Sequence, residues 1–202
     1  CVESKLQGRK NMKTAYLLVF DGLSDWEPGL AIAEINKSKK YQVKTIGLNQ
    51  NTVTTVGGVS IVPDYTLDEI NYGDAALFLL PGGELLEKSP LPPLVPVVRR
   101  FRKLEIPVAA ICGPTVFLAR HGFLETAQHT SNGKKYLQDL IGDYPGSDLY
   151  LNQPSVSDKG VITANGIASV EFARDILSEL DIYDPETLKN WYDFFKNPWL
   201  ED

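Results

Sequence analysis

The architecture of this chain can be worked out from one segment, Glu105-Ile-Pro-Val-Ala-Ala-Ile-Cys-Gly-Pro-Thr-Val-Phe-Leu-Ala-Arg120. Residues 106–111 form an apolar run that is too short for a helix, which predicts a strand buried on both faces, as in a parallel sheet. Gly113 then permits a tight turn, and Pro114 suits the first turn of a helix because its missing N–H would have no partner there. Residues 115–120 are predicted to continue that helix.

Cys112 lies at the predicted corner between this strand and this helix. A strand-turn-helix corner lifts a nucleophile above the edge of a sheet. The free N–H groups and the positive dipole end of the helix favour the thiolate form of a cysteine placed there. The alternative is a small buried cysteine that only packs. The apolar run before Cys112 and the Gly-Pro pair after it favour a reactive thiol.

The rest of the chain alternates between apolar runs and amphipathic stretches. We expect strands at residues 13–20, 41–48, 75–80 and 161–164, a hairpin at 51–63 and an edge strand within 143–158. Helices are expected at 24–36, 66–69, 134–141 and 169–180, and another follows the proline-rich segment 90–96 and runs to residue 103. This alternation predicts an α/β fold: a three-layer α/β/α sandwich, flavodoxin-like, with a mostly parallel sheet and right-handed crossovers. Thr66 and Glu69 have the spacing of a capping box.

The two ends of the chain differ in composition from its centre. Residues 1–11 are polar and aperiodic, and we expect them to be disordered or an extension before a single domain over 12–202.

Near the end, Asp184 is predicted to cap a helix over about 185–197. Its aromatic stripe either packs on its own domain or forms a lid or dimer patch. The stripe comprises Leu188, Trp191, Tyr192, Phe195 and Trp199.

Composition excludes several classes of function. The net charge of −6, without a basic cluster, argues against nucleic acid or an anionic membrane as a partner. The chain has only two cysteines, which predicts no disulfide framework and a cytoplasmic, reducing location. No apolar run approaches the length of a membrane span. We expect no metal site, because the two histidines and two cysteines lack ligand spacing.

Two further motifs follow predicted strands. Leu80-Pro-Gly-Gly83 ends one apolar run, and Asp21-Gly-Leu-Ser-Asp-Trp-Glu27 follows another. Ligands of open α/β sheets bind outside the carboxyl ends of the strands, so both motifs are expected near Cys112. Each also has a purely structural explanation. Pro-Gly-Gly makes a tight turn, and Ser24 and Glu27 have the spacing of a capping box.

Together with these two motifs, Ala109-Ala-Ile-Cys-Gly-Pro114 resembles the nucleophile elbow of the ThiJ/PfpI superfamily, which has the class I glutamine amidotransferase-like fold. The match in order and spacing covers about residues 13–180, and is closest to uncharacterised bacterial members. The resemblance implies that Cys112 is the nucleophile. It also implies that backbone N–H groups of Gly83 and Gly113 form the oxyanion hole.

The resemblance gives Glu27 a role in addition to helix capping. In the family, an acid five residues after the glycine of this loop contacts the cysteine, and Gly22 and Glu27 have that spacing. We expect Glu27 to be protonated and to donate to the thiolate of Cys112, because burial and a neighbouring anion favour the neutral carboxyl. An ionised Glu27 would instead repel the thiolate.

Two histidines are available as the acid/base group. His121 ends the elbow helix beside Gly122, a predicted C-cap residue, where its side chain points away from Cys112. His129 matches a family position just after the elbow helix and close to the cysteine. The resemblance therefore implies that His129 is the proton shuttle, and the alternative is a hydrogen-bonded structural histidine.

Departures from the family narrow the predicted activity. Family proteases carry a histidine directly after the cysteine, where this chain has Gly113, and glutaminases use a late histidine, whereas none follows His129. We therefore expect a homodimeric, cofactor-independent hydrolase or lyase that acts through Cys112 on a small carbonyl or amide compound, as an amidase, glyoxalase or deglycase does. The alternatives are a redox-sensing stress protein with an oxidisable Cys112, or a non-catalytic binding scaffold.

Overall fold

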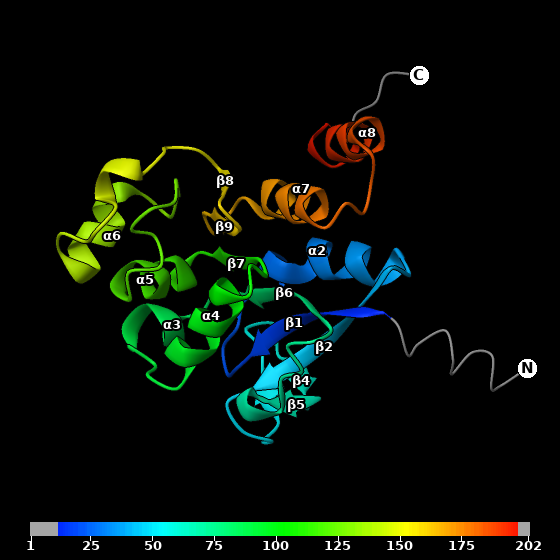
Figure 1. Ribbon diagram of the computed structural model, residues 1–202, viewed down its shortest axis with the longest axis horizontal. Helices are drawn as coiled ribbons and strands as arrows, with labels where there is room; N and C mark the ends of the chain where they lie inside the picture. Colours follow the sequence, from blue (N-terminus) through cyan, green and yellow to red (C-terminus); the bar gives the residue numbers. More distant parts are fainter. Residues whose placement is uncertain (1–11, 198–202) are drawn as a thin grey trace, which may run out of the picture.

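The computed structural model describes residues 12–197 and is a three-layer sandwich of helices around a sheet (Figure 1). The seven strands lie in the order β5-β2-β1-β6-β7-β9-β8. All neighbours are parallel except β8 and β9. The strands are β1 (Lys13–Val19), β2 (Tyr41–Gly47), β5 (Tyr65–Thr66), β6 (Ala75–Leu80), β7 (Val108–Ile111), β8 (Ser155–Asp158) and β9 (Val161–Ala164). The predicted fold class is confirmed.

The central strands are mostly apolar because helices cover both faces of the sheet. Every residue of β6, β7 and β9 is buried. Phe78 of β6 stacks on Phe101 with 4.7 Å between ring centroids, which ties the sheet to the helix beside it. The core therefore runs through the middle of the sheet, directly beneath the corner that carries Cys112.

The helices belong to two groups. α2 and α7 pack against each other, and α8 packs on α7, whereas α4 and α5 both contact β7 and α3 packs on α5. The helices are α2 (Trp26–Lys37), α3 (Glu84–Lys88), α4 (Leu94–Lys103), α5 (Gly113–Arg120), α6 (Lys134–Ile141), α7 (Ser169–Glu179) and α8 (Pro185–Lys196), with 3-10 turns η1 (Leu67–Glu69) and η2 (Ser147–Leu149). The connections β1-α2-β2 and β6-α4-β7 run in opposite directions across the sheet, and right-handed crossovers therefore place α2 and α4 on opposite faces.

Most predicted elements are present, with small shifts at their ends. The hairpin is formed by β3 (Val53–Thr54) and β4 (Ser60–Ile61). β7 begins at Val108, two residues later than predicted, because the N–H of Ile106 bonds to the Phe101 carbonyl and not to the sheet. The short helix α3 was not predicted.

Two predicted helix caps are confirmed. The Glu69 carboxylate accepts from the Thr66 N–H at 2.8 Å, which closes the capping box of η1. At α8, the Asp184 side chain accepts from the N–H groups of residues 186 and 187. The α8 stripe is split: Leu188 and Trp191 pack against the core, whereas 36% of Phe195 is exposed. Trp199 and residues 1–11 lie outside the described residues.

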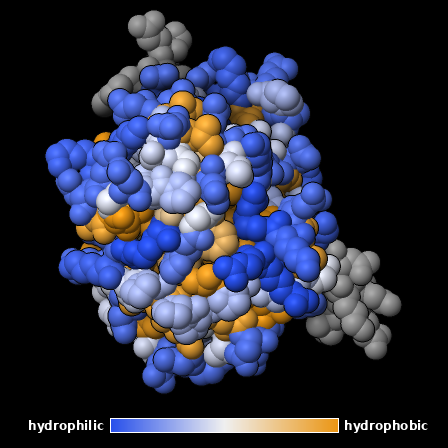
Figure 2. All heavy atoms as spheres, turned by 60° about the vertical axis from the view of Figure 1, so that its left-hand side comes forward, coloured by the Kyte–Doolittle hydropathy of each residue, from blue (hydrophilic) through white to orange (hydrophobic). Residues whose placement is uncertain are grey.

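The surface carries few large apolar side chains. The face in Figure 2 is mostly hydrophilic, with separate apolar areas between the charged side chains. Across residues 12–197, none of the helices is both long enough and apolar enough to cross a membrane.

Candidate active site

The candidate site is a groove of about 470 Å³ that Cys112 lines. Cys112 directly follows β7, and the other lining residues come from the segments that follow β1 and β9 and from the loop before α6. The carboxyl ends of parallel strands meet there, as the doubly wound topology requires. The lining residues are Ser24, Trp26, Glu27, Cys112, Asn132, Asn165, Gly166 and Ile167.

Cys112 adopts a strained backbone conformation at the start of α5, with φ 64° and ψ −126°. A positive φ is unusual for a residue with a side chain. Two backbone hydrogen bonds hold the corner: the Cys112 N–H donates to the Ala164 carbonyl at 3.0 Å, and the Thr115 N–H donates to the Cys112 carbonyl at 3.1 Å. Cys112 is half-buried. The predicted strand-turn-helix corner is therefore present and directs the sulfur into the groove.

Glu27 lies almost completely buried beneath the groove, with 1% of its surface exposed. Its Oε2 accepts a hydrogen bond of 2.5 Å from the Gly82 N–H. Glycine is required at position 82, because a Cβ there would lie 2.1 Å from that oxygen. The predicted capping box of Ser24 and Glu27 is wrong. α2 begins at Trp26, the residue at its N-cap is Asp25 and not Ser24, and the Glu27 carboxyl bonds to the loop after β6.

The pKa values of Glu27 and Cys112 are linked. Burial raises the pKa of Glu27 to about 7, although the Gly82 N–H and the Cys112 side chain act in the opposite direction. Burial also raises the pKa of Cys112, and the Glu27 charge adds to that effect, whereas the Asn132 amide and the Gly113 N–H lower the pKa. The helix N-terminus was expected to favour the thiolate, but burial outweighs it. A protonated Glu27 removes the repulsion, so the thiolate is favoured when Glu27 holds a proton.

Asn132 contacts the nucleophile and was not identified from the sequence. Its Nδ2 donates to Cys112 Sγ at 3.2 Å, and its Oδ1 accepts from the Gly166 N–H at 2.9 Å. The backbone N–H can only donate, which fixes the oxygen of the amide towards Gly166 and the nitrogen towards the sulfur. An Asn-Gly pair before a helix is an ordinary turn signal, so its pattern did not indicate this contact.

His129 follows the helix that begins after Cys112. Among the hydrogen bonds of residues 12–197, none connects His129 to Cys112. Its Nδ1 lies 2.8 Å from the Ala127 carbonyl and its Nε2 lies 2.8 Å from the Tyr144 hydroxyl. The carbonyl can only accept, so Nδ1 donates to it and Nε2 accepts from the hydroxyl. Burial lowers the pKa of His129, which keeps the ring neutral. Because both nitrogens are occupied, this geometry does not support the predicted proton shuttle and favours the structural alternative.

His121 lies at the end of α5, where its Nε2 is 2.7 Å from the Pro90 carbonyl. It lies at the opposite end of α5 from Cys112, as predicted.

The two glycines of the predicted oxyanion hole lie against each other. A Cβ on Gly113 would lie 2.8 Å from the Gly83 carbonyl oxygen, and a Cβ on Gly83 would lie 2.6 Å from the Phe20 ring. Close packing therefore requires glycine at both positions. Their role as oxyanion donors stays a prediction.

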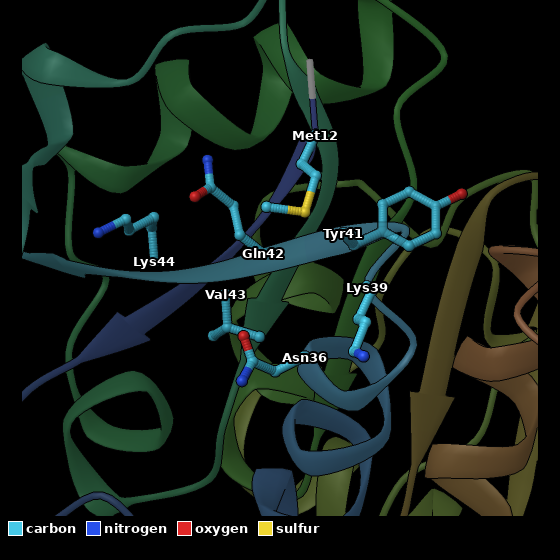
Figure 3. Close-up of a pocket in the computed structure, with 7 residues that line it drawn as sticks. All are labelled: Met12, Asn36, Lys39, Tyr41, Gln42, Val43 and Lys44. Atoms are coloured by element: carbon cyan, nitrogen blue, oxygen red, sulfur yellow. The ribbon is translucent and has the colours of Figure 1, made fainter. Parts of the chain in front are cut away.

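A cavity of about 520 Å³ lies elsewhere on the sheet (Figure 3). Tyr41, the first residue of β2, and Met12, which precedes β1, place it at the amino ends of the strands. The described residues that line it include no cysteine, carboxylate or histidine, and the chemistry of Cys112 and Glu27 is at the opposite edge, so we do not regard it as the active site. Across residues 12–197, no cluster of three or more histidine, cysteine or acidic side chains is suited to hold a metal ion.

Comparison with known proteins identifies the family. The family model for DJ-1/PfpI matches residues 13–179. The chain belongs to the DJ-1/PfpI family. A relative of this DJ-1/PfpI protein is YoaZ of Bacillus subtilis (strain 168), named an uncharacterized protease, which is 41% identical over 187 residues that cover 89% of each chain.

Two solved structures of the family resemble this DJ-1/PfpI chain closely. The thiJ/pfpI family protein from Bacillus anthracis is 38% identical, with a TM-score of 0.84 over 93% of this chain and 92% of that one. A DJ-1 superfamily protein from Agrobacterium tumefaciens is 31% identical, with a TM-score of 0.84 over 93% of this chain and 100% of that one. The predicted resemblance to the superfamily is confirmed.

Proposed function

We propose that this DJ-1/PfpI protein is a cysteine-dependent hydrolase or lyase that acts on a small carbonyl or amide compound. The observation that carries the proposal is the pairing of Cys112 with the buried Glu27. A Cβ on Gly166 would lie 3.0 Å from Sγ and 3.2 Å from Glu27 Oε1, so the thiol and the carboxyl border the same point of the groove. A carboxyl with a pKa of about 7 can exchange a proton with a thiol near neutral pH.

In the proposed reaction, Sγ of Cys112 attacks the carbonyl carbon of the substrate. A C–S bond forms, the π electrons of the carbonyl move to its oxygen, and the thiol proton passes to Glu27. The N–H groups of Gly83 and Gly113 are the proposed donors to the oxyanion. With an amide, Glu27 then returns the proton to the leaving nitrogen as the C–N bond breaks, which leaves a thioester on Cys112. With a 2-oxoaldehyde, Glu27 protonates the oxyanion to give a thiohemiacetal, and transfer of a proton from C1 to C2 converts it into a thioester. Water then hydrolyses either thioester to an acid and the free thiol. We assign the proton to Glu27 and not to His129, because only Glu27 acts on the thiol.

Proteolysis and glutamine hydrolysis fit these residues less well. Gly113 follows Cys112 and has no side chain to act as a base. The Nε2 atom of His129 is hydrogen-bonded to the Tyr144 hydroxyl. Amidase, glyoxalase and deglycase chemistry is the range that the residues support.

A second candidate function is redox sensing. The half-buried thiol of Cys112 is accessible from the groove, and the Asn132 amide beside it could donate to the oxygens of an oxidised sulfur. A protonated Glu27 would donate in the same way. These groups favour a stable sulfenic or sulfinic acid.

A substrate panel separates these candidates. We expect turnover of methylglyoxal, glycated amines or small amides by the wild type, measured by loss of substrate, and none by Cys112→Ser. If no substrate turns over and mild peroxide adds oxygen only at Cys112 by mass spectrometry, redox sensing replaces the enzyme proposal. If neither occurs, the chain is a binding scaffold.

We also propose a cytoplasmic homodimer. A free, half-buried Cys112 suits a reducing compartment. On α8, Phe194 is 58% exposed and Phe195 is 36% exposed, and aromatic side chains are enriched at interfaces. We expect twice the chain mass by light scattering at high micromolar concentration, and a monomeric mass at that concentration would contradict the dimer.

A further inference from the structure

The turn that follows β9 lies directly against the sulfur of Cys112. A Cβ on Gly166 would be 3.0 Å from Sγ and 3.2 Å from the Cβ of Cys112, so a side chain there would crowd the thiol, and glycine lets the backbone come this near. The turn is closed by its own hydrogen bonds: the Ala168 N–H donates to the Asn165 carbonyl at 3.0 Å, and the Ile167 N–H donates to Asn165 Oδ1 at 3.1 Å. The backbone of Gly166 is therefore part of the wall beside the nucleophile.

Two side chains from distant parts of the chain bond to the Gly166 backbone. Nε1 of Trp26 donates to the Gly166 carbonyl at 3.1 Å, and the Gly166 N–H donates to Oδ1 of Asn132 at 2.9 Å. Trp26 is the first residue of α2, whereas Asn132 lies in the loop before α6. Glycine has more backbone freedom than any other residue. Because only its Cα separates the carbonyl from the N–H, the bond to Trp26 limits how far the Gly166 N–H can turn.

The Asn132 amide can donate to the sulfur in only one of its two orientations. Its Nδ2 lies 3.2 Å from Sγ of Cys112, while its Oδ1 faces the Gly166 N–H. A half-turn of the amide would place the oxygen, which cannot donate, against the thiol. Asn132 is exposed, so water competes for both ends of the amide. The Gly166 N–H therefore selects the orientation that donates to Sγ.

We propose that Trp26 is a positioning residue for Cys112: its indole N–H holds the Gly166 backbone, which keeps the Asn132 amide directed as a donor to Sγ. The groups follow one another in the order indole, Gly166 backbone, amide and sulfur, and each contact is a hydrogen bond no longer than 3.2 Å. A donor that is already oriented stabilises the thiolate without the entropic cost of ordering it as the thiol ionises. This inference rests on the proposed function in taking the thiolate as the reactive form of Cys112.

Trp26→Phe tests the inference, because it removes the indole N–H and keeps an aromatic ring. Trp26 is 54% exposed, so the smaller ring leaves no cavity in the core. We expect the pKa of Cys112 to rise by about half a unit, which slows alkylation by iodoacetamide at pH 7 roughly threefold. Rates at Cys112 are measured across the pH range by peptide mass spectrometry. Their midpoint gives the pKa of the thiol, and their plateau at high pH reports access to the sulfur.

Trp191→Phe is the matched control. It removes another indole N–H, but on α8, which does not line the groove, so the pKa of Cys112 and the plateau rate should equal those of the wild type. Glu27, which faces the sulfur from α2, and Glu87, which lies against Gly113 from α3, are unchanged in both variants. Circular dichroism checks the fold of each variant. If Trp26→Phe does not fold, Trp26→Leu removes the same N–H.

A double-mutant cycle separates this route from a displacement of Glu27, the sequence neighbour of Trp26. Asn132→Ala should raise the pKa of Cys112 by itself, and adding Trp26→Phe should raise it no further, because the indole acts through the amide. Asn132→Asp keeps an acceptor for the Gly166 N–H but loses the donor to Sγ, so it should raise this pKa at least as much as Asn132→Ala. An unchanged pKa in Trp26→Phe or Asn132→Asp, or an equal rise with and without Asn132, would overturn the inference.

The measured quantity is the pKa of a thiol and not turnover. A chain that turns over no substrate would refute the proposed enzyme, and the same pKa values would still decide the role of Trp26. Conversely, turnover by the wild type together with an unchanged thiol pKa in Trp26→Phe would support the enzyme and refute the positioning role.

Discussion

Cys112→Ser is expected to reduce turnover of the substrate found in the panel by about 10³-fold or more. Serine keeps the shape of the side chain, but its hydroxyl has a far higher pKa than a thiol, and Glu27, with a pKa of about 7, is too weak a base to activate it. Removal of a nucleophile commonly costs this much even when the rest of the site is intact. The measurement is kcat/KM for both proteins under identical conditions.

The control for Cys112→Ser is a substitution at His129, another residue predicted to be catalytic, which leaves the thiol in place. His129→Gln breaks a buried pair with Tyr144, so it should lower the melting temperature and leave kcat/KM within severalfold of the wild type. A loss in His129→Gln as large as that in Cys112→Ser would restore the proton shuttle predicted from the sequence. Activity retained in Cys112→Ser would remove Cys112 as the nucleophile.

Glu27→Ala is expected to change the reactivity of Cys112 in opposite directions on the two sides of pH 7. Below that pH Glu27 is neutral, and we expect it to donate to the sulfur. Alanine would remove this donor and should slow alkylation, by about tenfold if the donor shifts the thiol pKa by one unit. Above that pH Glu27 is charged and raises the pKa of Cys112, so alanine removes a repelling charge and should speed alkylation. The ratio of wild-type to variant rates should therefore fall as the pH rises.

Glu27→Gln is the matched variant, because its amide donates at every pH and carries no charge. It should alkylate faster than Glu27→Ala across the whole range and show no crossing near pH 7. A constant ratio between wild type and Glu27→Ala would mean that Glu27 and the thiol do not interact. A variant that is faster at every pH would mean that Glu27 is ionised throughout and only repels.

The free energy of unfolding should also depend on the protonation state of the Glu27 carboxyl. The pKa of Glu27 is raised from 4.5 to about 7 in the folded chain, so the folded state holds a proton that the unfolded state has lost between these values. The contribution of Glu27 is complete below pH 4.5 and is lost as the pH rises through 7. Glu27→Gln should remove this part of the pH dependence of unfolding by urea.

The parts of the fold that could be predicted from the sequence are those that local physics decides. β6 is an uninterrupted apolar run, and β9 is apolar except for Thr163. Turn residues bound both strands, and their predicted ends agree with the structure. The cap of α8 depends only on Asp184 and the residues after it. α3 was missed because it spans five residues and depends on packing against α5.

The site was harder to predict because its contacts join distant parts of the chain. The Glu27 carboxyl could accept a hydrogen bond either from the first turn of its own helix or from the Gly82 N–H, which is 55 residues away. Only the folded sheet places Gly82 close enough for the second bond. Asn132 approaches Cys112 from the loop before α6, and no spacing rule anticipates that contact. The family resemblance implied that His129 lies close to Cys112, but it did not indicate the hydrogen bonds of the ring to Ala127 and Tyr144.

The backbone of Cys112 sets a trade-off between stability and activity. A side chain at φ 64° and ψ −126° lies in a region that glycine tolerates, and such strain costs on the order of 1–3 kcal/mol. Cys112→Gly would relieve the strain, and a chain selected only for stability would favour it. The same torsion directs the sulfur into the groove, so relief of the strain removes the reactive atom. The protein would thus give up part of a marginal folding free energy to keep a thiol at this corner.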